Sequence, residues 1–433
     1  MSNEPTPESL QNTQKLMTRA NQVLAYGCLR SVIEGALDYP GGAFPQFADR
    51  AEGCRIYDTT GQAFVDWFIG WGPVILGYHH PEVDAAIADQ LRIGPHLSLM
   101  HPLEVEVAEM LVEMIPCAEK VAFGKNGSDV TCAAVRLARA YTGREGVLSC
   151  GYHGFHDWFQ VLNEQCQGLP SSLKNVIASF PYNDLDALED LLNLHEGKIA
   201  AVIIDPIQDA LPAPGFLEGL RELTRSHKAL LIFDEVVTGF RVAPGGVQEA
   251  YGVTPDLTCL GKALTNGMPL SALVGKAEFM EPMPRIFFGL TFRGETLSLA
   301  AAKACLNIYK REPVAKRLAE KGETVRERFN LSCAKHGLPW TLGGHPSRMK
   351  LLCSDTGRIT AEGARLLFVQ ECLKHGMFSR GILLTSHALD PEALETTAIA
   401  MDHAMETVAR AFEKDTLDGF LHFPVPPQAY CKT

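Results

Sequence analysis

The sequence has few features of a metal-binding or nucleic-acid-binding protein. Its 12 cysteines are scattered, with no CxxC pair and no Cys/His cluster at zinc spacing. We therefore expect no metal site and no disulfide framework. It has no basic run, and 39 basic against 51 acidic residues leave a net charge of −12. That charge disfavours nucleic acid as a partner.

Hydrophobic segments suited to a membrane or to secretion are missing as well. No apolar stretch approaches the roughly 20 residues of a transmembrane helix. The N-terminal residues MSNEPTPESLQNTQ contain no apolar segment like that of a signal peptide. We therefore expect a cytoplasmic protein whose cysteines stay reduced.

The composition itself is typical of a large globular protein. Of the 433 residues, 46% are hydrophobic and 21% are charged. A chain of this length buries an extensive core and usually forms two or more domains. No internal repeat or low-complexity segment divides it.

The N-terminal part of the chain mixes helical and strand patterns. Residues 1–35 have helix-like patterning, which the proline and glycine of DYPGGAFPQF (38–47) interrupt. RIYDTTGQAFVDW (55–67) predicts a β-hairpin around a Thr-Gly turn. LEVEVAEMLVEMI (103–115) has apolar residues at helical spacing and predicts an amphipathic helix.

From about residue 120, apolar strands alternate with helices or loops. The predicted strands are KVAFG (120–124), GVLSC (146–150), IAAVIID (199–205), ALLIFDE (229–235) and DLTCLG (256–261). SDVTCAAVRLARAYTG (128–143) predicts a helix that stops at Gly143. Because the strands are continuously apolar, both faces of their sheet should be buried, which indicates an α/β domain with a mostly parallel sheet. Beyond about residue 300, a helical pattern and short segments such as RMKLLC and GMFSRGILLT predict a smaller α+β domain.

Polar and glycine residues follow the predicted strands, and ligands of open α/β sheets bind beyond the carboxyl ends of strands. KNGSD (125–129) places Gly127 and Ser128 at the start of a helix. Free backbone N–H groups and the helix dipole favour an anion there, and glycine allows it to approach closely. The alternative is that Ser128 serves as an ordinary N-cap.

Asp234 ends the fully apolar run ALLIF. A buried carboxylate is costly without a cationic partner. That partner is either the protonated ring nitrogen of a cofactor or, in a structural ion pair, Arg241.

Four other residues allow two interpretations each. Tyr152 and His153 in GYHG either stack on a flat ligand or belong to the core. Thr291, in the aromatic loop FFGLTFRGE, is either a ligand contact or a turn residue. Lys262, between DLTCL and TNGMP, is either a solvated lysine or an amine held for chemistry.

A single ligand accounts for all of these features. Pyridoxal phosphate needs a helix N-terminus for its phosphate, an aromatic side chain for a ring face, an acid for its ring nitrogen and a lysine for its aldehyde. The lysine forms a Schiff base, and the protonated ring acts as an electron sink.

The segment FDEVVTGFRVAPGGVQEAYGVTPDLTCLGKALTNGMPLSALVG (233–275) closely resembles the signature region of class III aminotransferases, and within them the glutamate-1-semialdehyde 2,1-aminomutase-like group. The resemblance extends over about residues 50–310 and includes GYHG and PGFLEGLRELTR. It implies a fold-type-I transferase that binds pyridoxal phosphate. The large domain, residues 71–312, would hold a mostly parallel seven-stranded sheet flanked by helices. Residues 313–433 would form the small α+β domain, together with the N-terminal segment 1–70.

The resemblance also assigns roles to individual positions. These are Lys262 for the Schiff base and proton transfer, Asp234 for the pyridine nitrogen, Val236 beneath the ring, Gly127 and Ser128 for the phosphate, Tyr152 for ring stacking, Thr291 for the phosphate of the neighbouring subunit, and Trp71 for the substrate channel. The assignment of Thr291 implies a homodimer with shared active sites.

The chain departs from the aminomutases at several points. It has Asp205-Pro206 where Glu-Pro is common, and GGAFPQF (41–47) lacks the Ser and Arg of their N-terminal stretch. FHDWFQVLNEQCQGLPSS (155–172) is not glycine-rich like their gating loop, and RGILLTSHALD (380–390) has no clear match to their late carboxylate.

These departures favour an aminotransferase over an aminomutase. The leading hypothesis is transfer of nitrogen from an amino donor, through the pyridoxamine phosphate form of the cofactor, to an aldehyde or ketone. A sugar or polysaccharide precursor is one candidate acceptor. The alternatives are a glutamate-1-semialdehyde 2,1-aminomutase and a non-catalytic binding protein with the same fold. The presence of both Lys262 and Asp234 weighs against the non-catalytic protein.

Overall fold

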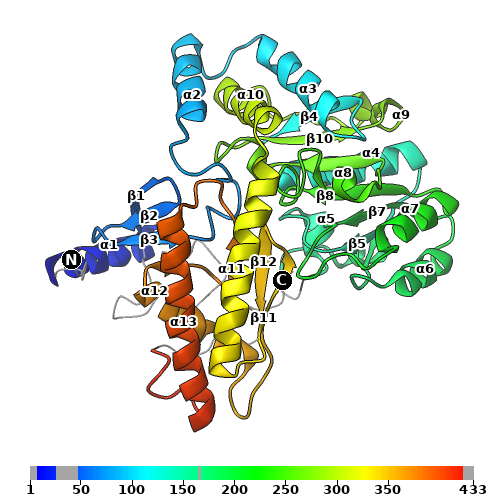
Figure 1. The fold of residues 1–433 in the computed structure, drawn as a ribbon. Helices are drawn as coiled ribbons and strands as arrows, with labels where there is room; N and C mark the ends of the chain where they lie inside the picture. The colour runs from blue at the N-terminus through cyan, green and yellow to red at the C-terminus, as the bar shows by residue number, and fades with distance from the viewer. Residues whose placement is uncertain (1–6, 26–46, 164–166, 423–433) are drawn as a thin grey trace. The chain divides into compact units, whose positions relative to one another are not determined.

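The structure is a computed structural model that describes residues 7–25, 47–163 and 167–422. The chain forms two compact units (Figure 1). The larger unit comprises Gly72–Ile75 and His80–Leu318, and the smaller unit comprises Met1–Trp71, Leu76–His79 and Ala319–Thr433. Within the described residues, no helix is both long and apolar enough to span a membrane.

The larger unit is built on a seven-stranded sheet in the order β4-β10-β9-β8-β7-β5-β6. Its strands are β4 (Lys120–Gly124), β5 (Gly146–Cys150), β6 (Ile177–Ser179), β7 (Ile199–Ile204), β8 (Leu230–Glu235), β9 (Leu257–Leu260) and β10 (Ser271–Gly275). The pairs β5–β6, β5–β7, β7–β8 and β8–β9 are parallel. Strand β10 is antiparallel to both β4 and β9. The predicted mostly parallel sheet is confirmed.

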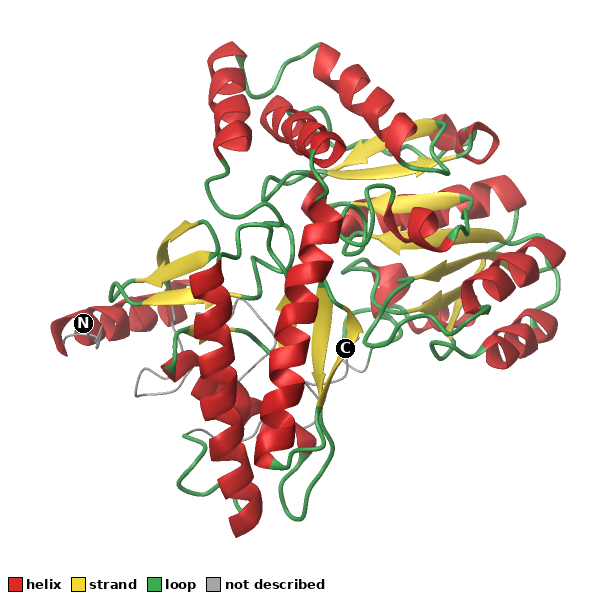
Figure 2. Cartoon of the chain, in the orientation of Figure 1, coloured by secondary structure: helices red, strands yellow, loops and turns green. Residues whose placement is uncertain are grey.

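Helices cover both faces of this sheet, which explains its continuously apolar strands (Figure 2). Alternate residues of β7 point to opposite faces. Ile203 packs in the core that contains Leu137 of α4 (Gly127–Thr142). Val202 packs in the core that contains Leu188 of α6 (Leu185–Leu194) and Leu220 of α7 (Phe216–Ser226). Burial on both sides leaves the strand ends as the places where polar groups reach a ligand.

Three helices lie beside the β4–β10 edge of the sheet. These are α2 (Pro81–Ile93), α3 (Pro102–Met114) and α10 (Thr296–Arg311). Helix α10 packs against α2 and α3, and α3 packs against β4 (Figure 1). The predicted helix at 103–115 is thus confirmed, and so is the helix at 128–143, whose C-cap is Gly143 in the left-handed conformation.

The smaller unit has two small sheets and a helical layer. One sheet has the order β1-β2-β3-β13 and the other β11-β12-β14. The elements are α1 (Pro7–Val23), β1 (Ala48–Glu52), β2 (Arg55–Asp58), β3 (Ala63–Asp66), β11 (Thr341–His345), β12 (Arg348–Leu352), α12 (Ala361–Lys374), β13 (Met377–Phe378), β14 (Ile382–Leu384) and α13 (Pro391–Lys414). Helix α11 (Val314–His336) leads into this unit from the larger one. Trp67, Phe368 and Met401 lie in its core.

The hairpin predicted at 55–67 is formed by β2 and β3. Its turn is held by Asp58, whose carboxylate Oδ1 accepts hydrogen bonds from the backbone N–H of Thr60 (2.8 Å) and Gln62 (3.0 Å). Of the loop predicted at 38–47, residues 38–46 lie outside the described residues.

Candidate active site

The carboxyl ends of the central strands meet around a cavity of about 180 Å³. Each of β4, β5, β7, β8 and β9 is followed by residues that line it. The lining is formed by Gly127, Ser128, Thr131, Tyr152, His153, Gly154, Asp205, Asp234, Val236, Val237 and Lys262. Six predicted cofactor residues therefore share one cavity, although they come from four separate segments of the chain.

The glycine turn after β4 is the N-terminus of helix α4. Helix α4 begins at Gly127, with Asn126 as its N-cap. The Asp129 carboxylate accepts hydrogen bonds from the backbone N–H of Asn126 (2.7 Å) and Lys125 (3.0 Å). A Cβ on Gly127 would lie 2.9 Å from a methyl of Val236, so this position accepts only glycine without a shift of its neighbour.

Ser128 is not the N-cap of α4, so the alternative of an ordinary cap is wrong at this position. Its hydroxyl oxygen instead accepts a hydrogen bond from the Phe155 N–H (2.9 Å). A Cβ on Gly154 would come within 2.3 Å of the same oxygen, and Gly154 has a φ of +102°. The segment after β5 thus packs against the turn after β4. Because the Ser128 hydroxyl oxygen acts as an acceptor in this contact, its proton can be donated to an anion.

A buried histidine–aspartate pair lies at the centre of the site. His153 Nδ1 is 2.8 Å from Asp234 Oδ2, and the two side chains are 0% and 7% exposed. His153 stacks on Trp158 with an interplanar angle of 13°. Its carbonyl accepts a hydrogen bond from the Thr131 hydroxyl (2.7 Å). His153 therefore fixes the rotamer of Asp234, and the partner of Asp234 in this structure is His153 and not the Arg241 that sequence reasoning offered.

The other nitrogen of His153, Nε2, is buried and has no hydrogen-bond partner among the described residues. A buried polar atom without a partner costs free energy. It belongs to a residue that lines the cavity, but the atom itself is inaccessible to solvent.

Glu235, next to Asp234, has a structural role. It is 1% exposed, and its carboxylate accepts hydrogen bonds from the Val247 N–H (2.6 Å) and the Gln248 side-chain amide (3.2 Å). Burial raises the pKa of Glu235 to about 7. A Cβ on Gly246 would lie 2.2 Å from this carboxylate. Glu235 therefore holds the start of α8 (Gly246–Tyr251) and does not line the cavity.

Lys262 follows β9 and begins a short 3₁₀ turn, Lys262–Leu264. Its φ of +38° lies in the left-handed region, which costs a residue with a side chain about 1 kcal/mol or more. The turn is fixed from the core, because the Tyr309 hydroxyl donates a hydrogen bond to the Ala263 carbonyl (2.5 Å). The lysine is thus held by its backbone at the cavity wall.

Tyr152 and Val236 complete the lining with apolar surface. Tyr152 is 56% exposed, and its ring meets Phe159 edge-on with 5.5 Å between centroids. Val236 packs against the glycine turn, and its N–H donates to Asp234 Oδ1 (3.2 Å). An aromatic ring and a branched aliphatic side chain in one cavity suit a flat ligand.

Two predicted residues lie elsewhere. Trp71 belongs to the smaller unit, where it is 45% exposed. Thr291 belongs to the larger unit, in an exposed loop between Phe287 and Phe292, and it is not among the residues that line the cavity. Their predicted roles are not tested by this arrangement.

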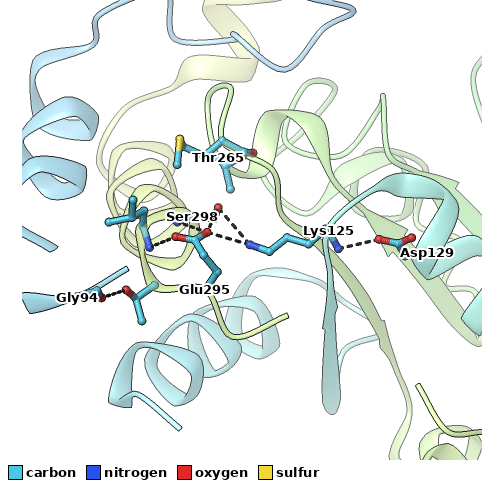
Figure 3. A network of polar contacts seen from close by, with 9 residues as sticks. Gly94, Lys125, Asp129, Thr265, Glu295 and Ser298 are labelled. Carbon is cyan, nitrogen blue, oxygen red and sulfur yellow. Dashed lines mark hydrogen bonds and ion pairs between the residues drawn. The ribbon is translucent and has the colours of Figure 1, made fainter. Parts of the chain in front are cut away.

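Lys125 joins the glycine turn to the N-terminus of α10 (Figure 3). Its ammonium donates to Glu295 Oε2 (2.9 Å) and to the Ser298 hydroxyl (3.4 Å). The Glu295 carboxylate also accepts from the Leu297 N–H (2.6 Å) and so caps α10. Because Glu295 ends the loop that carries Thr291, this ion pair ties that loop to the turn.

The Lys125–Glu295 pair gives a stability prediction. The two side chains are 14% and 15% exposed. We expect Lys125→Met to lower the free energy of unfolding by about 2 kcal/mol, since a largely buried carboxylate loses its charged donor. Urea denaturation measures the change, and a cycle with Glu295→Gln isolates the pair.

The exposed pair Arg285–Glu281, with side chains 65% and 71% exposed, is the matched control. Arg285→Met should change stability by less than about 0.5 kcal/mol. An equal effect of the two substitutions would show that the Lys125 pair has no special role.

A larger cavity, of about 390 Å³, lies at the opposite ends of the strands. Gly146 and Ile199, the first residues of β5 and β7, line it together with Arg144, Lys174 and Lys198. Ligands of α/β sheets bind at the carboxyl ends. The smaller cavity gathers the carboxylates, the histidine and the lysine, so it is the better candidate despite its size.

Sequence reasoning missed two contributions to the site. It assigned His153 only a stacking role, and it did not single out Thr131. The signal for Thr131 was its place one helical turn after Gly127, which puts both residues on one side of α4. The pairing of His153 with Asp234, 81 residues away, left no local signal.

Known proteins resemble this chain over most of its length. The family model for class III aminotransferases matches residues 38–338. The glutamate-1-semialdehyde 2,1-aminomutase of Roseiflexus castenholzii is 35% identical over 412 residues, which is 88% of this chain and 94% of that protein. The 3-aminobutyryl-CoA aminotransferase of Cloacimonas acidaminovorans is 36% identical over 345 residues, which is 78% of this chain and 82% of that protein.

Among solved structures, the FumI protein of Sphingopyxis sp. MTA144, in a form that contains pyridoxal phosphate, superposes with a TM-score of 0.86 at 30% identity. The match covers 93% of this chain and 98% of that one. The family match, the relatives and the fold agree with the resemblance seen in residues 233–275. This chain belongs to the class III aminotransferase family.

Proposed function

We propose that this protein is a pyridoxal-phosphate-dependent aminotransferase that moves nitrogen from a small-molecule amino donor to a separate aldehyde or ketone. The observation that carries the proposal is the shared cavity in which Lys262, Asp234 and the glycine turn at Gly127 come together. Membership of the class III family supports the same reaction class.

The residues present fit this cofactor. The free N–H groups of the α4 N-terminus and the Ser128 hydroxyl suit its phosphate. Val236 and Tyr152 offer apolar surface for its ring, and Asp234 offers a carboxylate for its ring nitrogen. His153, whose Nδ1 lies 2.8 Å from Asp234 Oδ2, holds that carboxylate in place.

Lys262 and Asp234 would have separate roles in the reaction. When bound, pyridoxal phosphate withdraws electrons from the substrate carbon that carries nitrogen. The Lys262 amine is the group that takes a proton from this carbon and returns it on acceptor binding. The Asp234 carboxylate, oriented by His153, holds a proton on the ring nitrogen through opposite charge. The buried surroundings of this pair strengthen that interaction.

Two segments of the sequence favour transfer of nitrogen between two molecules over the aminomutase reaction. A mutase retains a diamine between its two half-reactions, which needs a closing loop and groups that grip a small acid. Segment 155–172 is not glycine-rich, and 41–47 lacks the Ser and Arg of the mutase stretch. These observations support an aminotransferase, although mutases stand among its relatives.

The test is a comparison of the two reactions. Protein loaded with pyridoxamine phosphate should aminate an external carbonyl acceptor once and then need a separate amino donor, followed through the cofactor absorbance. With glutamate-1-semialdehyde as the sole substrate, 5-aminolevulinate should not accumulate beyond about one equivalent per site. Sustained formation over many turnovers would establish the aminomutase reaction instead.

We also propose a homodimer with shared active sites, in a cytoplasmic location. Thr291 lies in a loop whose Phe287 and Phe292 are 83% and 58% exposed, and Leu99 and Met100 before α3 are 83% and 69% exposed. Exposed apolar side chains in this loop and before α3 suit burial against a partner subunit. A partner that covers the loop would receive the Thr291 hydroxyl near its own phosphate turn. The described cysteines are all free, which suits a reducing compartment.

A further inference from the structure

The larger cavity, at the amino ends of the strands, is lined by more cations than carboxylates. Its volume of about 390 Å³ is within the usual range for small-molecule sites, and it lies entirely within the larger unit. Arg144 lies just before β5, Lys174 lies in the 3₁₀ helix Ser171–Val176, and Lys198 immediately precedes β7. Glu145 is the carboxylate in the lining. Three positive charges against one negative charge give the cavity a net charge of about +2, in a chain whose net charge is −12.

None of these three cations forms an ion pair with a carboxylate of the residues that the structure describes. The Glu145 carbonyl accepts a hydrogen bond from Nε of Arg139 on α4 (2.8 Å). Burial lowers the pKa of Arg139, and the charge of Glu145 partly opposes that effect. The Glu145 carboxylate thus acts on a cation outside the cavity lining. Lys174 and Lys198 are exposed, so water solvates them in the free protein and an anion can take its place.

Arg144 is held in place by backbone carbonyls near the starts of the neighbouring strands. Its Nη1 donates hydrogen bonds to the carbonyls of Ile199 (3.1 Å), His227 (2.8 Å) and Lys228 (3.1 Å). The first carbonyl begins β7, and the other two lie just before β8. Nε and Nη2 of Arg144 have no hydrogen-bond partner among the described residues, and neither is a buried atom. Accessible N–H groups on a fixed guanidinium suit an oxyanion.

Lys198 belongs to a turn that is bonded to β5. Its carbonyl accepts a hydrogen bond from the Gly146 N–H (2.9 Å), and its own N–H donates to the His195 carbonyl (2.9 Å). A Cβ on Gly146 would lie 2.9 Å from the Lys198 carbonyl oxygen, so this close contact requires glycine. Gly197 has a φ of +70°, in the left-handed region that favours glycine. The fold therefore fixes the backbone that carries this cation.

The rest of the cavity lining includes apolar side chains. Val147, Ile177 and Ile199, from three adjacent strands, are buried in the cores of the sheet and also line the cavity. Sites for small molecules combine an apolar wall with a few placed polar groups. The lining thus suits a ligand that has an anionic group joined to a carbon body.

We propose that Arg144, Lys174 and Lys198 form a binding site for a small phosphate monoester, separate from the cavity that contains Lys262. The phosphate group of such an ester carries a charge of about −2 at pH 7 and has three terminal oxygens. This charge balances the net charge of the cavity, and the oxygens match its three cationic side chains. A carboxylate has one charge and two oxygens, so it meets fewer of these groups. The carbon body of the ester packs on the apolar part of the lining.

Calorimetric titration of the intact protein, saturated with pyridoxal phosphate, tests the site with phenyl phosphate as the probe. Phenyl phosphate should bind with about one equivalent per chain, and benzoate should bind about 10-fold more weakly. The double variant Lys174→Gln, Lys198→Gln should weaken phenyl phosphate binding by about 10-fold or more, and both lysines are exposed, so the fold should persist. Lys120 is the matched control, an exposed lysine that begins β4 at the other edge of the sheet. Lys120→Gln should leave binding unchanged.

Chemical modification locates the bound probe. Saturating phenyl phosphate should slow the acetylation of Lys174 and Lys198 by an N-hydroxysuccinimide ester and leave the acetylation of Lys120 unchanged. No binding up to about 10 mM probe, or equal binding by the double variant, would overturn the site. Benzoate binding as tight as that of phenyl phosphate would overturn the assignment to phosphate. Weaker binding in Ser128→Ala, with no change in the double variant, would place the probe at the glycine turn and refute the separate site.

Discussion

Lys262→Ala protein should lose multiple turnover by a factor of about 10⁴ or more. Under the proposed function, the substitution removes two roles at once, the covalent attachment of the cofactor and the proton transfer at the substrate carbon. The substitution should leave the fold intact. A φ of +38° is as unfavourable for alanine as it is for lysine, so the backbone strain at this position does not change. Steady-state transfer from an amino donor measures the loss.

Borohydride reduction provides the independent readout of this assignment. Peptide mapping of reduced wild-type protein should place the cofactor on Lys262, and the variant should carry no such adduct. Lys276 is the control lysine. It follows the last residue of β10 and is the N-cap of α9 (Ala277–Met280). Its replacement by alanine should leave both the adduct and the rate unchanged. An adduct found on Lys276 would refute the assignment of Lys262.

The placement of Asp234 and Lys262 could be predicted because each lies at the carboxyl end of an apolar strand. ALLIFDE and DLTCLG mark β8 and β9, and strand ends of a parallel sheet share one edge. The resemblance of residues 233–275 to class III aminotransferases is confirmed by the family match. Local patterns sufficed here because the strands are short, continuous and fully buried.

Pairings between distant segments could not be predicted in the same way. His153 and Asp234 meet because β5 and β8 flank β7 in the sheet, and strand order is a property of the whole fold. The same holds for Lys125, whose partner Glu295 is 170 residues away. A sequence pattern reports which residues are buried, but it does not report which of them face each other.

Asp234→Asn should lower the rate of proton removal from substrate by about 10³-fold while the cofactor still binds. Asparagine has the shape of aspartate, and its side-chain oxygen can still accept a hydrogen bond from His153 Nδ1, so the buried arrangement should persist. What is lost is the negative charge that, under the proposed function, would keep the ring nitrogen of the cofactor protonated as charge develops in the transition state. Single-turnover absorbance changes with a saturating amino donor measure this step apart from substrate binding.

Asp205→Asn is the matched control, because it removes the same charge from another carboxylate that lines the same cavity. If any negative charge in the cavity served equally well, the two variants would be slowed alike. If Asp234 acts on the ring nitrogen, its variant alone should show the large effect, and the absorbance band of the bound cofactor should shift with pH in that variant and not in Asp205→Asn. Near-normal single-turnover rates in Asp234→Asn would contradict the role, and the His153–Asp234 pair would then have to be regarded as structural.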